Sequence, residues 1–191
     1  MEKVLVTGAT GYIALHCIHQ LLNQGYAVNG SLRSPERKDE IIEALKKDST
    51  PVENLSLFTF NLTEDDGWDE GMEGCDFLLH VASPLSINTH DEDYFVKPAV
   101  SGVKRAFKFA KKHNVKKVIL TSSVAAILET GEDKQYFDET DWSDPESPEI
   151  SHYSKSKTLA EMAAWDFVKE EGHPFESVSY THLTLPTIAL V

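Results

Sequence analysis

Apolar runs rich in β-branched residues alternate along this chain with stretches of helical periodicity. The short runs are bounded by turn residues and predict buried strands, and the longer periodic stretches between them predict helices. This alternation is typical of a parallel sheet that is covered by helices on both faces. The predicted strands are Lys3–Thr7, Ala27–Leu32, Leu55–Phe60, Asp76–His80 and Lys116–Thr121, and the predicted helices are Tyr12–Gln24, Pro35–Lys47, Glu92–Lys112 and His152–Glu171.

One long segment in the carboxyl half lacks such periodicity. Residues 129–151 hold nine acidic residues against one lysine, with serine, proline and glycine between them, and predict a loop. An acidic run of this kind is usually a solvated surface. A loop of this length in a compact domain also often borders a functional site, so both interpretations stay open.

The composition is that of an ordinary globular protein. The 191 residues are 41% hydrophobic and carry a formal net charge of −13 at pH 7, which disfavours nucleic acid as a partner. No apolar run reaches the ~20 residues of a membrane-spanning helix, and the amino terminus carries no signal-peptide pattern. We therefore expect a cytoplasmic protein without a membrane partner. Cys17 and Cys75 are expected to be free thiols; His16 and His19 lack further ligands, and no metal site is expected.

A glycine-rich turn follows the first predicted strand and opens the first predicted helix. In Val4-Leu-Val-Thr-Gly8-Ala-Thr-Gly11-Tyr-Ile-Ala14, Gly8 permits a tight turn and Gly11 lets a pyrophosphate approach the backbone. The amide groups and the dipole at a helix amino terminus favour such an anion. Because a strand precedes it and a helix follows, the turn is interpreted as dinucleotide-binding rather than as a turn that serves only the fold.

The second predicted strand is followed by a basic residue rather than an acidic one. NAD-binding sites usually present a carboxylate to the ribose 2′-hydroxyl about 20 residues beyond the glycine turn. Here the strand ends in Gly30-Ser-Leu-Arg33, and Arg37 and Lys38 follow. A guanidinium suits the 2′-phosphate of NADP, so we expect NADP(H) as the cofactor. The alternative is an exposed surface arginine.

Tyr153 and Lys157 are four residues apart in the last predicted helix and therefore share one of its faces. An ammonium group near a phenol stabilises the phenolate, which suits a tyrosine for general acid–base catalysis near neutral pH. In a chain with six tyrosines and 18 lysines and arginines, such a spacing also arises by chance. Its weight depends on the motifs that precede it.

Together these motifs resemble the extended short-chain dehydrogenase/reductase family, and within it the branch of dihydroflavonol reductases, cinnamoyl-CoA reductases and related aldehyde or ketone reductases. The resemblance implies an α/β fold, a Rossmann-like doubly wound parallel sheet with helices on both faces, and NADPH-dependent reduction of an aldehyde or ketone to an alcohol. It runs from about Lys3 to Glu176 and is carried by Val6-Thr-Gly-Ala-Thr-Gly-Tyr-Ile13, Gly74-Cys-Asp-Phe-Leu-Leu-His-Val-Ala-Ser-Pro84, Val118-Ile-Leu-Thr-Ser-Ser123 and Tyr153 to Glu161.

The resemblance also implies the roles of individual residues. Ser123 would hydrogen-bond the substrate carbonyl oxygen, although a serine at a strand end can also simply make a turn. Tyr153 would donate a proton to that oxygen as hydride arrives, and Lys157 would support the tyrosine and hold the nicotinamide ribose. His80 is expected to be a core residue rather than a catalytic one. The expected cofactor-binding residues are Thr7, Gly8, Thr10, Gly11, Tyr12, Ile13, Arg33, Lys38, Asn61, Leu62, Val81, Ala82, Ser83, Thr121, Tyr153 and Lys157.

The sequence departs from the family at two places. Plant flavonoid reductases place an asparagine five residues after the catalytic serine, where this chain has Leu128, so a smaller or more apolar carbonyl compound is the expected substrate. After Glu176 the family continues for a long stretch that builds much of the substrate pocket. Here residues 177–191 resemble the translated sequencing-adapter tails of unrelated proteins. We expect residues 1–176 to form the NADP-binding domain and 177–191 to be an anomalous tail, the alternative being a divergent sixth strand with an extension.

With the carboxyl-terminal substrate region missing, we expect little turnover from the 191 residues alone. Two other functions fit parts of the pattern. A nucleotide-sugar epimerase or dehydratase shares the serine, tyrosine and lysine but commonly has an acid where Arg33 stands, and a non-catalytic NADP-sensing protein typically lacks the tyrosine and lysine. The expected partner is a small-molecule carbonyl substrate. The chain is expected to be a monomer, or a homodimer through Glu92–Lys112 and His152–Glu171, the helices through which many relatives dimerise.

Overall fold

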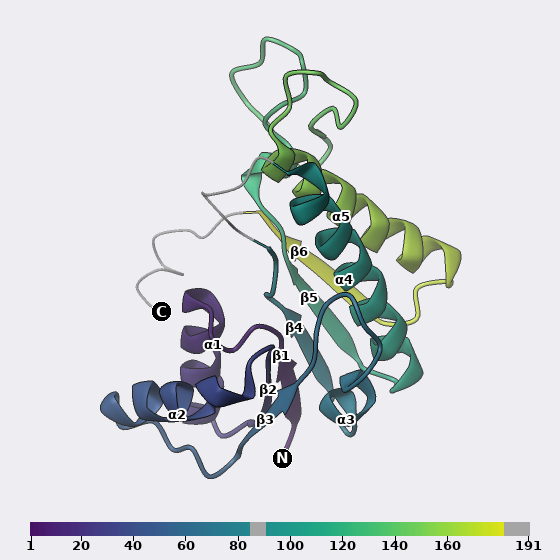
Figure 1. Ribbon diagram of the computed structural model, residues 1–191. Coiled ribbons are helices and arrows are strands. Elements are labelled where there is room, and N and C mark those ends of the chain that lie inside the picture. The colour runs from purple at the N-terminus through teal and green to yellow at the C-terminus, as the bar shows by residue number, and fades with distance from the viewer. Residues whose placement is uncertain (85–90, 182–191) are drawn as a thin grey trace.

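The computed structural model describes residues 1–84 and 91–181 and shows a parallel sheet between two layers of helices (Figure 1). Neighbouring strands all run parallel, and their order is β3-β2-β1-β4-β5-β6. The order changes direction between β1 and β4, and a crevice at the carboxyl ends of the strands is the usual ligand site there. The strands are β1 (Lys3–Val6), β2 (Ala27–Leu32), β3 (Leu55–Thr59), β4 (Phe77–His80), β5 (Lys117–Thr121) and β6 (Glu176–Tyr180).

The helices form the two outer layers that the sequence pattern predicts. In Figure 1, α1 and α2 lie on one face of the sheet, and α4 and α5 lie on the other. No helix within residues 1–84 and 91–181 is both long and apolar enough to cross a membrane. The α-helices are α1 (Tyr12–Asn23), α2 (Lys38–Lys47), α3 (Trp68–Met72), α4 (Glu92–Lys112) and α5 (His152–Glu170), and two short 3₁₀ helices are η1 (Pro35–Arg37) and η2 (Val124–Ala126).

Each face of the sheet has its own hydrophobic core, because alternate residues of a strand point to opposite faces. On β1, Val4 and Val6 join the core beneath α1 and α2, whereas Leu5 joins the core beneath α4 and α5. All three are buried. This double burial explains why the strands have continuous apolar sequences rather than alternating ones. The fold class expected from the sequence is confirmed.

The short helix α3 is absent from the predicted elements. Its five residues span little more than one turn, which is too short for a helical period to show in the sequence. Trp68 anchors it: the indole is fully buried, stacks on Phe109 with ring centroids 5.9 Å apart, and donates its Nε1–H to Asn61 O at 2.9 Å. The expected single helix over Pro35–Lys47 is likewise a 3₁₀ turn followed by α2.

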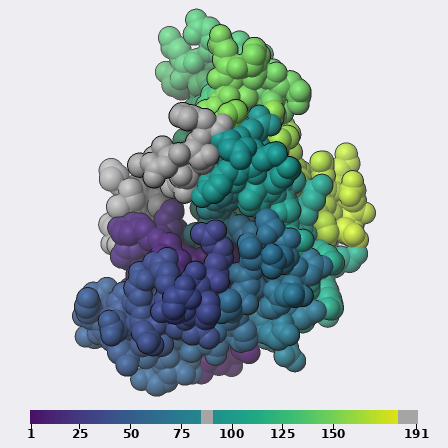
Figure 2. Space-filling model, viewed as in Figure 1, coloured from purple at the N-terminus to yellow at the C-terminus, as the bar shows by residue number. Residues whose placement is uncertain are grey.

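The acidic segment, residues 129–151, is a loop, as predicted, and projects from one end of the molecule (Figure 2). Its two ends are fastened near the start of α5. The carboxylate of Glu129 accepts hydrogen bonds from Ser151 N and from the Ser154 hydroxyl. The Ser143 hydroxyl accepts from Glu129 N at 2.8 Å and donates to Ala125 O at 2.9 Å. The base of the loop therefore adjoins the first turn of α5, where Tyr153 lies.

A sixth strand begins at Glu176, one residue before the predicted start of the tail. Residues 177–180 pair with β5 as the rest of β6, whereas residues 182–191 of the predicted tail lie outside the described part of the chain. The match of β6 to its surroundings is imperfect. The hydroxyls of Ser177 and Ser179 are buried without a hydrogen-bond partner among the described residues. That residues 177–191 are an anomalous tail foreign to the family stays a prediction.

Candidate active site

The glycine turn between β1 and α1 packs against the residues that follow β4. Gly8 has a φ of +76°, which side-chain-bearing residues rarely adopt, and a Cβ there would approach the Cα and Cβ of Ala82 to 3.2 and 3.0 Å. Gly11 N donates to Gly8 O at 2.8 Å and closes the turn. Gly11 directly precedes α1 and provides no side-chain cap, so the first amides of the helix keep their donor capacity for an anion.

The end of β2 holds this turn in place through Ser31, which the sequence did not single out. Ser31 Oγ accepts from Gly8 N at 3.0 Å, and Ser31 O accepts from Ala9 N at 2.7 Å. Arg33 follows directly and is exposed. Arg37 instead bonds Glu40 through Nε and Nη2 at 2.7 and 2.6 Å. Arg33 is therefore the better placed guanidinium for a phosphate beside the turn.

Of the other residues predicted around the turn, three lie at the amino end of α1 and one lies at the start of α2. Tyr12 is 76% exposed, and Ile13 is half-buried beside it in the first turn of α1. Thr10 is half-buried between the two glycines, and Lys38 is half-buried at the start of α2. Thr10, Tyr12 and Ile13 thus lie at the amino terminus of α1, where a dinucleotide phosphate would bind.

The Thr7 hydroxyl connects the turn to β4 and the residues after it through three hydrogen bonds. Its Oγ1 accepts hydrogen bonds from Val81 N and Ala82 N, both at 3.0 Å. With both lone pairs occupied, the hydroxyl must donate to its third neighbour, His80 Nδ1, at 3.1 Å. His80 is therefore the neutral tautomer with its proton on Nε2. The histidine is buried, as expected for a core residue, and its role is to hold Thr7.

Acid should destabilise the folded chain through His80. Burial, together with the charge of Lys157, lowers the pKa of His80 from 6.5 to about 3. Between these values the unfolded chain binds a proton that the folded chain does not, so the free energy of unfolding should fall as the pH drops from about 6.5 to 3, by up to about 5 kcal/mol. Urea denaturation at a series of pH values measures this loss.

The matched variant is His80→Gln, whose side-chain oxygen can still accept from Thr7. This variant should lose less stability between pH 6.5 and 3 than the parent chain. The same loss in both proteins would show that other groups cause the acid sensitivity.

Asn61 and Leu62, predicted near the adenine, follow β3 and are half-buried. Both also have structural contacts. Asn61 O accepts from the buried Trp68 indole, and Leu62 O accepts from Arg105 Nη1 at 2.5 Å. The Leu62 side chain packs against Gly102 of α4, where a Cβ would approach Leu62 Cβ to 3.1 Å. Asn61 and Leu62 thus follow the carboxyl end of β3, at the same edge of the sheet as the glycine turn.

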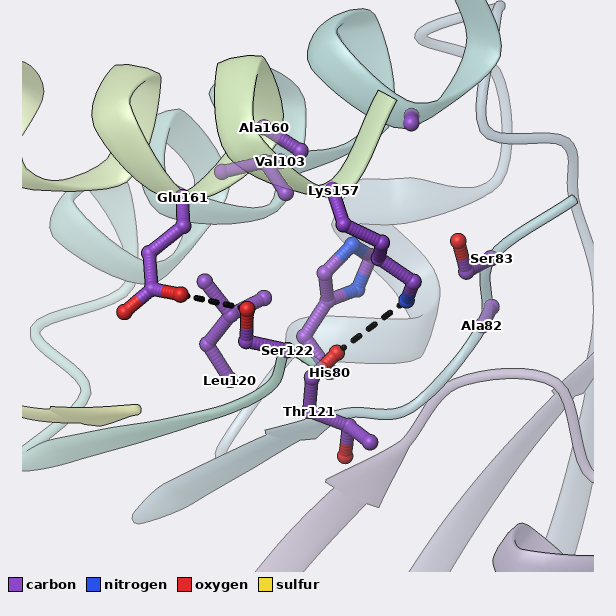
Figure 3. Close-up of a pocket in the computed structure, with 11 residues that line it drawn as sticks. His80, Ala82, Ser83, Val103, Leu120, Thr121, Ser122, Lys157, Ala160 and Glu161 are labelled. Carbon is purple, nitrogen blue, oxygen red and sulfur yellow. Dashed lines mark hydrogen bonds between the residues drawn. The ribbon is translucent and has the colours of Figure 1, made fainter. Parts of the chain in front are cut away.

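Lys157 extends from α5 to the carboxyl end of β5. Its Nζ donates to Thr121 O at 3.4 Å (Figure 3). The same Nζ lies 5.9 Å from the centroid of the Tyr153 ring. Lys157 as a residue is 7% exposed. Burial lowers the pKa of Lys157 from 10.5 to about 8, and the charge of Glu161 opposes this change. The ammonium form therefore dominates at neutral pH, beside the tyrosine.

Ser123 is the second residue after β5 and caps the amino end of η2. Its Oγ accepts from Ala125 N at 3.2 Å, which is the turn-forming bond expected of a strand-end serine. This bond occupies a lone pair of the oxygen and leaves the O–H able to donate to another acceptor. The helix α5 packs against η2, so the segment with Ser123 adjoins the helix with Tyr153 and Lys157. A turn-forming role and a substrate-binding role are therefore compatible in Ser123.

A small cavity lies behind these groups, between the ends of β4 and β5 and the helices α4 and α5 (Figure 3). Ala82, Ser83 and Thr121 line it on the side of the strand ends. Two further lining residues, Ser122 and Glu161, form a buried hydrogen bond that the sequence did not predict. The signal for it was weak: Glu161 follows Lys157 by one helical turn, and Ser122 precedes Ser123.

The comparison with family models agrees with this arrangement. Residues 4–188 match the model of the NAD dependent epimerase/dehydratase family. The chain belongs to this family. The resemblance stated from the sequence motifs is thereby confirmed at the level of the family.

Among curated proteins, the members of the epimerase/dehydratase family most similar to this chain include plant flavonoid reductases. The chain is 35% identical to dihydroflavonol 4-reductase of Arabidopsis thaliana over 194 residues, which cover 98% of the chain and 50% of that protein. It is 37% identical to an anthocyanidin reductase of Vitis vinifera, over 88% of the chain and 52% of the relative. The chain thus spans about half the length of the curated relatives it matches.

Solved structures of reductases, one of them complexed with NADPH, are also similar to this chain. The yeast methylglyoxal/isovaleraldehyde reductase Gre2, complexed with NADPH, matches with a TM-score of 0.79 and 31% identity, over 94% of this chain and 56% of Gre2. Vestitone reductase from alfalfa (Medicago sativa) matches with a TM-score of 0.78 and 33% identity, over 95% of this chain and 56% of the reductase. Each similarity again covers little more than half of the longer protein.

Proposed function

We propose that this family member contributes the cofactor-binding half of an NADPH-dependent reductase that converts an aldehyde or ketone to an alcohol. Tyr153 donates the proton to the carbonyl oxygen while the nicotinamide delivers hydride. Ser123 donates a hydrogen bond to the same oxygen. Lys157 supplies positive charge beside the tyrosine and holds the nicotinamide ribose. Donors already directed at an oxygen that gains negative charge stabilise the transition state most strongly.

The observation that carries the proposal is the approach of α5 to the end of β5. There the Lys157 ammonium lies beside the Tyr153 ring and reaches Thr121 O, two residues before Ser123. Three residue types suited to carbonyl reduction thus come from two elements that meet at the carboxyl edge of the sheet. The glycine turn lies at the same edge, on β1, separated from β5 only by β4.

NADP rather than NAD is the proposed cofactor. The amides of the turn and of the first turn of α1 would hold the pyrophosphate, and Arg33 would contact the 2′-phosphate at the end of β2. The Gly8 position supports a dinucleotide in general, because the close approach of backbone to Ala82 leaves no room for a side chain in the turn. The NADPH-bound yeast relative supports the choice of NADP.

The proposed substrate is a small or apolar carbonyl compound rather than a flavonoid. Leu128, which stands where flavonoid reductases have an asparagine, follows η2 and is 46% exposed. An isobutyl group at this place offers apolar contact and no hydrogen bond to a hydroxylated ring. The yeast relative, which reduces methylglyoxal and isovaleraldehyde, supports a small aldehyde as a starting point for tests.

A nucleotide-sugar epimerase or dehydratase is the second candidate, because it uses the same serine, tyrosine and lysine. The exposed Arg33 at the end of β2 disfavours it, since such enzymes commonly place an acid there and prefer NAD. A cofactor-sensing protein without catalysis is disfavoured by the buried Lys157 cation, which costs stability and has a use in catalysis.

The test is an NADPH-oxidation screen with the gene product, after the gene has been re-sequenced across the codon for Glu176. Family sequence beyond that codon would support the anomalous tail that we propose for residues 177–191. Small aliphatic aldehydes and ketones should oxidise NADPH faster than NADH, and dihydroflavonols should react more slowly. Conversion of nucleotide sugars without net NADPH oxidation would contradict the proposed reductase.

A further inference from the structure

Glu161 is a buried carboxylate that the proposed mechanism does not use. Its side chain lies on α5, one helical turn beyond Lys157, and only 6% of the residue is exposed. Glutamate is almost never buried to this extent unless it is paired, because removing a carboxylate from water is unfavourable. The burial of the Glu161 carboxylate must therefore be compensated by the groups that contact it.

The partners of Glu161 lie on both sides of the candidate site. Its Oε2 accepts from the buried Ser122 hydroxyl, and its Oε1 accepts from Trp165 Nε1 at 3.3 Å. One turn earlier, Lys157 Nζ bonds Thr121 O. Figure 3 shows the two side chains descending from α5 onto adjacent residues at the end of β5. Two side chains of α5 thus hydrogen-bond the two residues that immediately precede Ser123.

Glu161 is the acidic neighbour of Lys157 in the lining of the cavity. His80 faces Lys157 from β4 but is neutral, since its Nδ1 accepts from Thr7. Tyr153 lies on the same helix and presents its ring. Among the described residues that line the cavity, Glu161 is the one carboxylate. Its charge acts against the burial that lowers the pKa of Lys157.

We propose that Glu161 is a positioning residue of the reductase site, which holds the Thr121–Ser123 segment against α5 and supplies the negative charge in the cavity that Lys157 also lines. The proposal rests on the proposed function, in which the Lys157 ammonium supports Tyr153 and the Ser123 hydroxyl binds the carbonyl oxygen. Glu161 touches neither substrate nor cofactor in this scheme. It acts through Lys157 and Ser122.

The test is the titration of Lys157 in Glu161→Gln, which keeps the hydrogen-bonding shape and removes the charge. Lysine labelled with ¹³C at Cε reports protonation by NMR, and the Lys157 signal is the one that disappears in Lys157→Met. In Glu161→Gln the titration midpoint should fall by about one pH unit or more. Glu161→Asp, which retains the charge, should keep the midpoint nearer that of the parent chain. Glu170→Gln, at an exposed position of the same helix, should leave it unchanged.

An unchanged Lys157 midpoint in Glu161→Gln would overturn the proposal. If Glu161→Gln does not fold, Glu161→Gln combined with Lys157→Met should fold, because no unpaired buried cation is left. Failure of that double variant as well would show that Glu161 is structural only. The titration needs neither cofactor nor turnover, so its outcome is independent of whether the reductase assay succeeds.

In a gene product that turns over, Glu161→Gln should lower kcat about tenfold with little change in the KM for NADPH, as expected when a proton-transfer step alone is weakened. The loss should be smaller in Glu161→Asp. Equal losses in both variants would contradict a role for the charge.

Discussion

Replacing Tyr153 with phenylalanine should abolish carbonyl reduction and leave NADPH binding nearly intact. The substitution removes only the hydroxyl that is proposed to donate a proton, and general acid catalysis contributes about 10²–10⁴-fold to a rate. The Tyr153 ring, which lies 5.9 Å from Lys157 Nζ, is retained. NADPH oxidation measures turnover, and quenching of protein fluorescence by NADPH measures binding.

Tyr136→Phe is the matched control, because it deletes a tyrosine hydroxyl from an 85% exposed position in the acidic segment. It should affect neither measurement. If Tyr153→Phe weakened binding and turnover by the same factor, the tyrosine would be a structural residue rather than the proton donor.

Replacing Arg33 with aspartate should shift the cofactor preference from NADPH toward NADH. The substitution removes a guanidinium proposed to bind the 2′-phosphate and adds a carboxylate that can accept from a ribose 2′-hydroxyl. Hydrogen bonds to charged groups contribute about 1.5–3 kcal/mol, so the dissociation constant for NADPH should rise roughly 10–100-fold. Parallel titrations with NADPH and NADH give the ratio of affinities.

Arg37→Asp is the control for this ratio, because the Arg37 guanidinium already bonds Glu40 and lies four residues further along. It should change the two affinities equally. A ratio that Arg33→Asp leaves unaltered would remove Arg33 from the cofactor site.

The positions of five strands along the chain could be predicted from the sequence because both faces of the sheet are buried. Runs such as Val4-Leu-Val6 then have no polar alternation, and the intervening helices have clear apolar stripes. The glycine turn was predictable for a related reason. Gly8 has a positive φ and packs against Ala82. This geometry restricts the position to glycine, and a glycine between a strand and a helix can be recognised in the sequence.

The contacts that complete the candidate site could not be read in the same way. Ser31 supports the turn and Ser122 bonds Glu161, but each partner is more than 20 residues away in the chain. Such a pair is brought together only by the packing of strand and helix, and a serine on a strand has no local pattern that names its partner. Ser123 could be recognised from the sequence, but its turn-forming contact could not be separated from its proposed role. The oxygen of its hydroxyl accepts from Ala125 N, whereas the proposed role uses the O–H as a donor.

The two buried hydroxyls of β6 have a consequence for the motions of the sheet. Leaving a hydroxyl buried without a partner costs about 1–3 kcal/mol, and among the described strands β6 pairs only with β5. Segments with such deficits detach in local opening reactions well below the free energy of global unfolding. We therefore expect β6 to open more readily than the other strands, which would expose the edge of β5 to pairing with an extended segment of another molecule.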